Sequence, residues 1–209
     1  MNIDAKIAWV EDRDEDLFVP EVKTWQFTHP LVVVPEGDSG FSYYSPGDQF
    51  LPPGSAPWQN EGVTALIGES VRSSFIAIPF SASSKNRTNR GVTMELTDDL
   101  EPVATVTERC TGHAARRYRL MIHEATATEK TDEIKKHLKE RFGEAEIDSL
   151  VYENSDSAHL PFRMTYRLSY PSLDGSIAGD RFMLKPLEFL QKAENPFTAQ
   201  ERQNAIVLD

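Results

Sequence analysis

The sequence has a single thiol, Cys110, followed three residues later by His113, and this pair is the first candidate for covalent chemistry. Catalysis by cysteine needs a thiolate nucleophile, a histidine that takes the thiol proton and an anion that orients the imidazole. A separation of three residues at the expected junction of a strand and a helix does not assure contact between thiol and imidazole. A lone cysteine is more commonly a small buried apolar residue. We therefore expect Cys110 to be structural and slow to react with alkylating reagents.

A second candidate, His29, lies at the head of an apolar run, Leu31–Val34. Four successive aliphatic residues are typical of a strand that is covered on both faces. Residues 35–40 have the composition of a turn, and Phe41–Tyr44 is predicted to be the returning strand of a hairpin, with Ser45 directly after it. Taken alone, these patterns indicate only a globular α+β protein.

Three short motifs give this stretch a resemblance to a known family. They are Gln26–His29 (QFTH), Tyr44–Gly47 (YSPG) and Phe50–Gly54 (FLPPG). In this order they resemble the second half of the transglutaminase-like domain found in many bacterial proteins. The resemblance implies that His29 occupies the position of the family's active-site histidine and Ser45 that of its aspartate. The family's nucleophilic cysteine lies upstream of the histidine, where this chain has only residues 1–28 and no cysteine.

The resemblance thus leaves one member of a catalytic triad present, one replaced and one missing. Ser45 can hold a histidine ring by a hydrogen bond, but it carries no charge to stabilise an imidazolium. We expect a non-catalytic binding or scaffolding segment of a larger bacterial transglutaminase-like protein, with His29 as a vestigial base. The alternative is a fragment of an active cysteine transglutaminase, amidase or protease, in which an upstream cysteine would pair with His29. The family resemblance also suggests the cell envelope or periplasm.

The remainder of the chain carries motifs of the same kind. They are Val106–Arg119, which begins VTER, Ala178–Arg181 (AGDR) and Asn195–Arg202, which begins NPF. They resemble the β-rich module that follows the transglutaminase-like domain in the same proteins and has no assigned activity. We therefore divide the chain at Gly68–Ser70. The resemblance implies that residues 1–69 are the C-terminal half of a degenerate transglutaminase-like domain and that residues 70–209 are a β-rich α+β module of unknown function.

The spacing of apolar residues predicts an α+β fold of mostly antiparallel sheets, with two helices in the C-terminal module. The expected strands are residues 3–9, 31–34, 41–44, 63–67, 75–80, 91–97, 102–107, 147–152, 160–170, 181–184 and 205–208. The clearest is 160–170, where apolar and polar residues alternate, and we expect residues 147–152 and 181–184 to lie beside it.

The two helices are expected between residues 111 and 143. The first follows Thr111, and the second begins at a capping box of Thr126 and Glu129 and ends at Gly143. Three apolar residues at every fourth position of the second helix should face the core: Ile134, Leu138 and Phe142.

The chain of 209 residues is acidic, with 33 Asp and Glu against 22 Lys and Arg and a net charge of −11. This charge argues against binding to nucleic-acid phosphates or to anionic lipid. We therefore interpret the basic cluster of Arg116, Arg117 and Arg119 as partners for carboxylates of the same chain. No apolar run reaches the ~18 residues of a membrane span, so we expect no membrane insertion of this segment.

We expect neither a metal nor a cofactor. The acidic run of residues 11–16 lacks the glycine and glutamate of a calcium loop, since Leu17 and Lys23 stand in their places. We do expect a partner surface, because both faces of the run Leu31–Val34 need cover. That surface would come from the upstream part of the parent protein or from self-association. A chain that begins and ends within predicted strands is also expected to be part of something longer.

Overall fold

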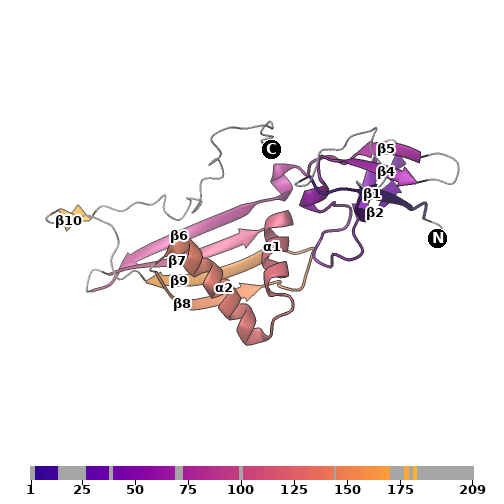
Figure 1. Cartoon of the computed structure of the whole chain (residues 1–209). Helices are drawn as coiled ribbons and strands as arrows, with labels where there is room; N and C mark the ends of the chain where they lie inside the picture. The colour runs from indigo at the N-terminus through magenta and orange to yellow at the C-terminus, as the bar shows by residue number, and fades with distance from the viewer. Residues whose placement is uncertain are drawn as a thin grey trace, which may run out of the picture.

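In the residues that it describes, the computed structural model shows two main antiparallel sheets, a separate two-stranded hairpin and two α-helices, so the α+β class expected from the sequence is confirmed (Figure 1). It describes residues 3–13, 27–37, 40–68, 73–98, 101–143 and 145–169, together with the short strands 177–178 and 181–182. Within these residues, a five-stranded sheet from the N-terminal part lies at one end of the molecule. A four-stranded sheet carries both helices (Figure 1).

The first sheet has the strand order β3-β2-β1-β4-β5. Its strands are β1 (Lys6–Val10), β2 (His29–Pro35), β3 (Phe41–Tyr44), β4 (Thr64–Gly68) and β5 (Ser73–Ala77). The β2–β3 hairpin is the one that the sequence predicted. β5 pairs with β4 along its whole length, so the first sheet continues past residues 69 and 70, where we predicted the boundary, as far as Ala77. The alternation within a strand does not reveal which sheet the strand joins.

Only one face of the first sheet is covered by described parts of the chain. The buried strand residues on that face are Ala8, Val10, Leu31, Val33, Ala65 and Ile67. On the opposite, outer face, Val32 and Val34 are half-buried, and Ile7 and Trp9 of β1 are exposed. The run Leu31–Val34 therefore has one face in the core and one facing outward, as strand geometry requires of successive residues.

The second sheet has the strand order β6-β7-β9-β8, and both helices pack on one of its faces (Figure 1). Its elements are β6 (Thr88–Leu96), β7 (Pro102–Cys110), α1 (Gly112–Ile122), α2 (Ala127–Phe142), β8 (Glu146–Glu153) and β9 (Phe162–Ser169). The predicted alternation of β9 is confirmed, since every second residue from Phe162 to Leu168 is buried. The pattern also predicted Leu160 as a core-facing residue of this strand, but Leu160 is exposed and lies before β9.

Residues 181–182 do not join this sheet. They form β11 (Arg181–Phe182), which pairs with β10 (Ile177–Ala178) in a separate two-stranded hairpin. The prediction that residues 181–184 lie beside β9 is therefore wrong for these two residues, because β7 and β8 already occupy both edges of β9. The motif at residues 195–202 and the strand predicted at 205–208 lie outside the described residues.

The ends and core face of α2 follow the prediction. Thr126 accepts a hydrogen bond from Glu129 N (3.4 Å), and Glu129 accepts one from Thr126 N (2.8 Å), which completes the capping box. Gly143 ends the helix with a φ of 61°. The three apolar residues expected to face the core, Ile134, Leu138 and Phe142, are buried.

The arginines of the basic cluster on α1 make different contacts. Arg119 is buried, and its guanidinium donates to the carbonyl oxygens of Asn154 (3.0 Å) and Leu160 (2.5 Å). Burial lowers the pKa of Arg119. Among the described contacts, Arg116 alone of the three pairs with a carboxylate, that of Asp48. The interpretation of the cluster as carboxylate partners is therefore wrong for Arg119, whose neighbours offer backbone carbonyls instead.

Candidate functional site

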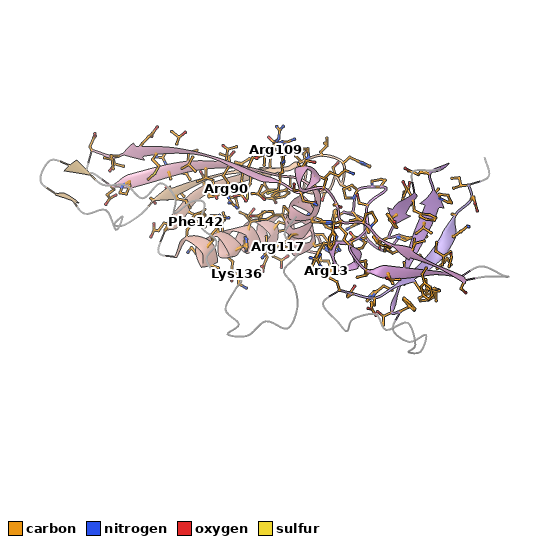
Figure 2. The ribbon with its side chains drawn as sticks, turned by 90° about the horizontal axis from the view of Figure 1, so that it is seen from above. Arg13, Arg90, Arg109, Arg117, Lys136 and Phe142 are labelled. Carbon is orange, nitrogen blue, oxygen red and sulfur yellow. The ribbon has the colours of Figure 1, made fainter. Side chains whose placement is uncertain are left out.

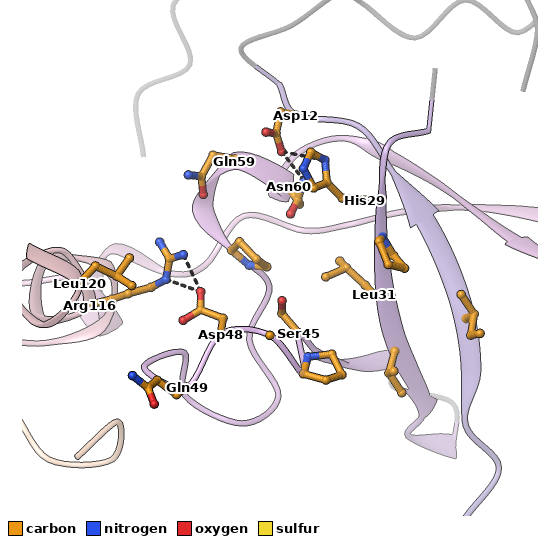
Figure 3. Close-up of a pocket in the computed structure, with 16 residues that line it drawn as sticks. Asp12, His29, Leu31, Ser45, Asp48, Gln49, Gln59, Asn60, Arg116 and Leu120 are labelled. Carbon is orange, nitrogen blue, oxygen red and sulfur yellow. Dashed lines mark hydrogen bonds and ion pairs between the residues drawn. The ribbon is translucent and has the colours of Figure 1, made fainter. Parts of the chain in front are cut away.

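A cleft of about 830 Å³ lies between the outer side of the first sheet and α1 (Figure 3). Its floor contains Ile7, Pro30 and Val32 of β1 and β2. Its walls come from segments far apart in the sequence, namely Asp12 and His29, the turn 45–49, Gln59 and Asn60, and Arg116 and Leu120 of α1. The cleft therefore combines an apolar floor with polar and charged walls.

His29 is the first residue of β2, and its side chain is half exposed at the rim of the cleft. Thr28 Oγ1 lies 2.9 Å from His29 Nδ1, and Asp12 Oδ1 lies 3.8 Å from the same nitrogen. Its Nε2 has no hydrogen-bond partner among the residues that the structure describes. The imidazole thus has a hydroxyl within hydrogen-bond distance of Nδ1 and a carboxylate 3.8 Å from the same nitrogen, and among the described residues it leaves Nε2 available.

Asp12 is the site residue that sequence reasoning missed. The antiparallel pairing of β1 with β2 places Val10 opposite His29, so the residues just after β1 lie beside the start of β2. Asn60 fixes the carboxylate, because its amide donates to Asp12 Oδ1 (2.8 Å) and to Glu11 O (3.0 Å), as Figure 3 shows for the first of these. The sequence showed Asp12 only as one member of an acidic run, and no local signal distinguished it.

Ser45 lines the same cleft, directly after β3. Its carbonyl accepts a hydrogen bond from Asp48 N (3.0 Å), which closes the turn that forms one wall. No hydrogen bond joins Ser45 to His29 among the described residues. The two positions singled out by the resemblance therefore face one cleft, but the carboxylate beside His29 is Asp12.

Two side-chain contacts connect α1 to turns of the N-terminal part. Arg116 donates to Asp48 Oδ2 from Nε (2.5 Å), and both side chains are largely buried. His113 Nε2 lies 2.8 Å from Glu61 Oε1, and Ser81 also donates to that carboxylate. These contacts hold α1 in place as one wall of the cleft.

Cys110 lies outside this cleft, at the end of β7 in the core of the second sheet. It is fully buried, so the expectation of a structural cysteine is confirmed with respect to burial. Burial raises the pKa of its thiol to about 11, a change that the neighbouring Thr88 hydroxyl only partly opposes. His113 faces Glu61 rather than Cys110, so the pair Cys110 and His113 forms no nucleophile and base.

Comparison with known proteins adds no relative. No family model matches this chain, and neither a curated protein nor a solved structure matches it. Among the described residues, no three histidine, cysteine, aspartate or glutamate side chains come together as metal ligands. In that same part of the chain, no helix is long and apolar enough to cross a membrane.

Proposed function

We propose that this chain is a non-catalytic binding segment of a larger transglutaminase-like protein, and that the outer face of its first sheet receives another segment of that protein. The observation that carries the proposal is the apolar character of this face. Ile7 is 55% exposed, Trp9 43% and Tyr44 38%. Leaving a large apolar side chain in water forgoes roughly 1.5–3 kcal/mol, so cover over this face would be strongly favourable.

Strand pairing makes these residues neighbours rather than scattered surface residues. Ile7 lies opposite Val32, which in turn lies opposite Tyr44. Trp9 lies opposite Leu66, which in turn lies opposite the exposed Phe75. Two rows of apolar side chains therefore cross the sheet, and contiguous patches of this kind mark interaction surfaces. The first row continues into the cleft, because Ile7 and Val32 are also part of its floor.

The negative charge of the N-terminal part of the chain indicates what kind of segment would bind to this face. Residues 1–69 contain 12 Asp and Glu against 3 Lys and Arg, which accounts for −9 of the net charge of −11. A second copy of the chain would bring the same negative charge to the interface, and like charges oppose association. The occupant that fits is an amphipathic segment with one apolar face and basic residues beside it.

The proposal that the chain is not a catalyst by itself rests on its thiol. The single cysteine is fully buried in the second sheet with a raised pKa, so it supplies no thiolate to His29. One observation favours the alternative of an active parent protein. Asp12 supplies the negative charge near His29 that Ser45 lacks, so an upstream cysteine would meet an imidazole with a carboxylate 3.8 Å from Nδ1.

The docking proposal is tested with the intact chain and two designed helical peptides, one of leucine and lysine and one of leucine and glutamate. We expect the leucine–lysine peptide to bind and to change the fluorescence of the protein, and the leucine–glutamate peptide not to bind. Ile7→Asn should weaken its binding at least about tenfold, because a buried apolar contact of roughly 1.5 kcal/mol or more is lost. Val151→Asn is the matched control, since Val151 is an exposed strand residue of the second sheet. Equal binding of both peptides, or equal loss in both variants, would contradict the proposal.

The non-catalytic part is tested by ammonia release from a glutamine peptide. We expect the isolated chain to give no release above the buffer blank. Release that disappears in His29→Ala would show that the chain is catalytic and would favour the alternative.

A further inference from the structure

Two adjoining clefts lie beside the first turn of α1, away from the cleft that contains His29. Their volumes are about 470 and 460 Å³, and they share a rim formed by Pro52, Pro53, Arg109, Thr111 and Gly112. No aspartate or glutamate is among the described residues that line either cleft. This is unexpected in a chain with 33 acidic residues, and it leaves the positive charges at these clefts without neutralising neighbours.

The positive charges come from Lys85, Arg87 and Arg109. All three side chains are exposed, and none has an ion-pair partner in the part of the chain that the structure describes. Arg109 lies on the face of the second sheet opposite the helices, as Figure 2 shows. It pairs across the strands with Asn89, which also lines the first of the two clefts and offers an amide donor.

The backbone that carries Lys85 and Arg87 is held firmly against α1. Asn86 Oδ1 accepts a hydrogen bond from His113 N (2.9 Å), and Arg87 O accepts one from Thr111 N (2.9 Å). Arg87 N in turn donates to Thr111 Oγ1 (3.1 Å). Gly112 permits this contact, because it has a φ of +56° and a Cβ there would lie 2.6 Å from Lys85 O. Since the loop is already ordered, less conformational entropy is lost when the cations engage a ligand.

We propose that these two clefts form a binding site for a small phosphorylated molecule, with its phosphate or diphosphate group held by Lys85, Arg87 and Arg109. Guanidinium groups match the geometry of phosphate oxygens, and three cations suit a multivalent anion better than a single carboxylate. The positive end of α1 adds to the same field. The prolines of the shared rim, Pro52 and Pro53, offer an apolar surface for the organic part of the ligand. A long polyanion is disfavoured by the net charge of −11.

The site is tested by isothermal titration of the intact chain with inorganic phosphate, pyrophosphate and acetate. We expect pyrophosphate to bind at a single site, phosphate to bind more weakly and acetate not to bind. The double variant Arg87→Gln/Arg109→Gln should weaken pyrophosphate binding at least about tenfold, since a hydrogen bond to a charged group contributes about 1.5–3 kcal/mol.

Arg163→Gln is the matched control, because Arg163 lies opposite Arg109 on the next strand but lines neither cleft. It removes one charge of the same type but no proposed contact to the phosphate, so it should weaken pyrophosphate binding clearly less than the double variant does. Thermal unfolding of each variant verifies that it is folded. Absence of pyrophosphate binding, binding of acetate with equal affinity, or equal weakening by Arg163→Gln would overturn the proposal. Ile7→Asn should leave pyrophosphate binding unchanged, which separates this site from the proposed docking face.

Discussion

The buried carboxylate of Glu108 allows the most exacting test of how the second sheet is stabilised. Its side chain is fully buried under the helices, and it accepts hydrogen bonds from Arg90 Nε (2.5 Å) and from the second guanidinium nitrogen (3.1 Å). The hydroxyls of Tyr118 (3.1 Å) and Tyr166 (3.5 Å) donate to the same carboxylate. Burial opposes the charge on Arg90, but the hydrogen bond and charge of Glu108 outweigh it and raise the pKa of Arg90.

We predict that Arg90→Met destabilises the protein by about 3 kcal/mol, the lower end of the range for removing one partner of a buried ion pair. The lower end applies because the two tyrosines still donate to the carboxylate and the Arg90 side chain is 16% exposed. Glu108→Gln should cost about 2 kcal/mol, since it leaves the guanidinium without its anion. The double variant removes both charges and should cost only about 1–2 kcal/mol, because an apolar or neutral replacement of a buried pair is often tolerated.

The measurement is a double-mutant cycle of urea unfolding, and the expected coupling between Arg90 and Glu108 is about 3 kcal/mol. The matched control is Arg167→Met with Asp148→Asn, an ion pair of the same sheet at 3.8 Å whose side chains are 47% and 38% exposed. Its coupling should remain below about 1 kcal/mol, as for surface pairs. A coupling at Arg90 and Glu108 no larger than that of the control would refute the reasoning that burial makes this pair strong.

Two further predictions concern Cys110 and Gly112. Because burial raises the pKa of Cys110 from 9.0 to about 11, the unfolded thiol ionises first, so the stability from this group is present below about pH 9 and is lost as the pH rises toward 11. Between pH 8 and pH 10.5 the free energy of unfolding of the wild type, measured in urea, should fall by about 2 kcal/mol more than that of Cys110→Ala. Iodoacetamide should label Cys110 far faster in urea than in the native protein. Equal falls in the free energy of unfolding, or equal labelling rates, would contradict this. In thermal unfolding, Gly112→Ala should destabilise the protein by about 1–3 kcal/mol more than Gly143→Ala. Both glycines have positive φ, but only Gly112 is crowded by a neighbouring backbone. Equal destabilisation by the two substitutions would mean that the backbone at Lys85 moves to make room for the new Cβ.

The sequence alone determined the features that depend on near neighbours. The alternation in β9, the β2–β3 hairpin and the capping box of Thr126 and Glu129 all appear where they were predicted. Each rests on side-chain periodicity or on hydrogen bonds within a few residues, so the pattern is local and can be seen in the sequence. The burial of Cys110 followed in the same way from its place at the end of a strand with one apolar face.

Only the tertiary structure decided which distant segments meet. Asp12 lies beside His29 because β1 pairs with β2, and Arg116 reaches Asp48 across 68 residues of sequence. β5 belongs to the first sheet although it follows the boundary that we predicted at Gly68–Ser70. Arg119 is charged, which predicts exposure, yet two carbonyl oxygens offered by a turn elsewhere in the chain allow it to be buried. Strand pairing, burial of charge and the walls of a cleft depend on these long-range contacts, and no local pattern encodes them.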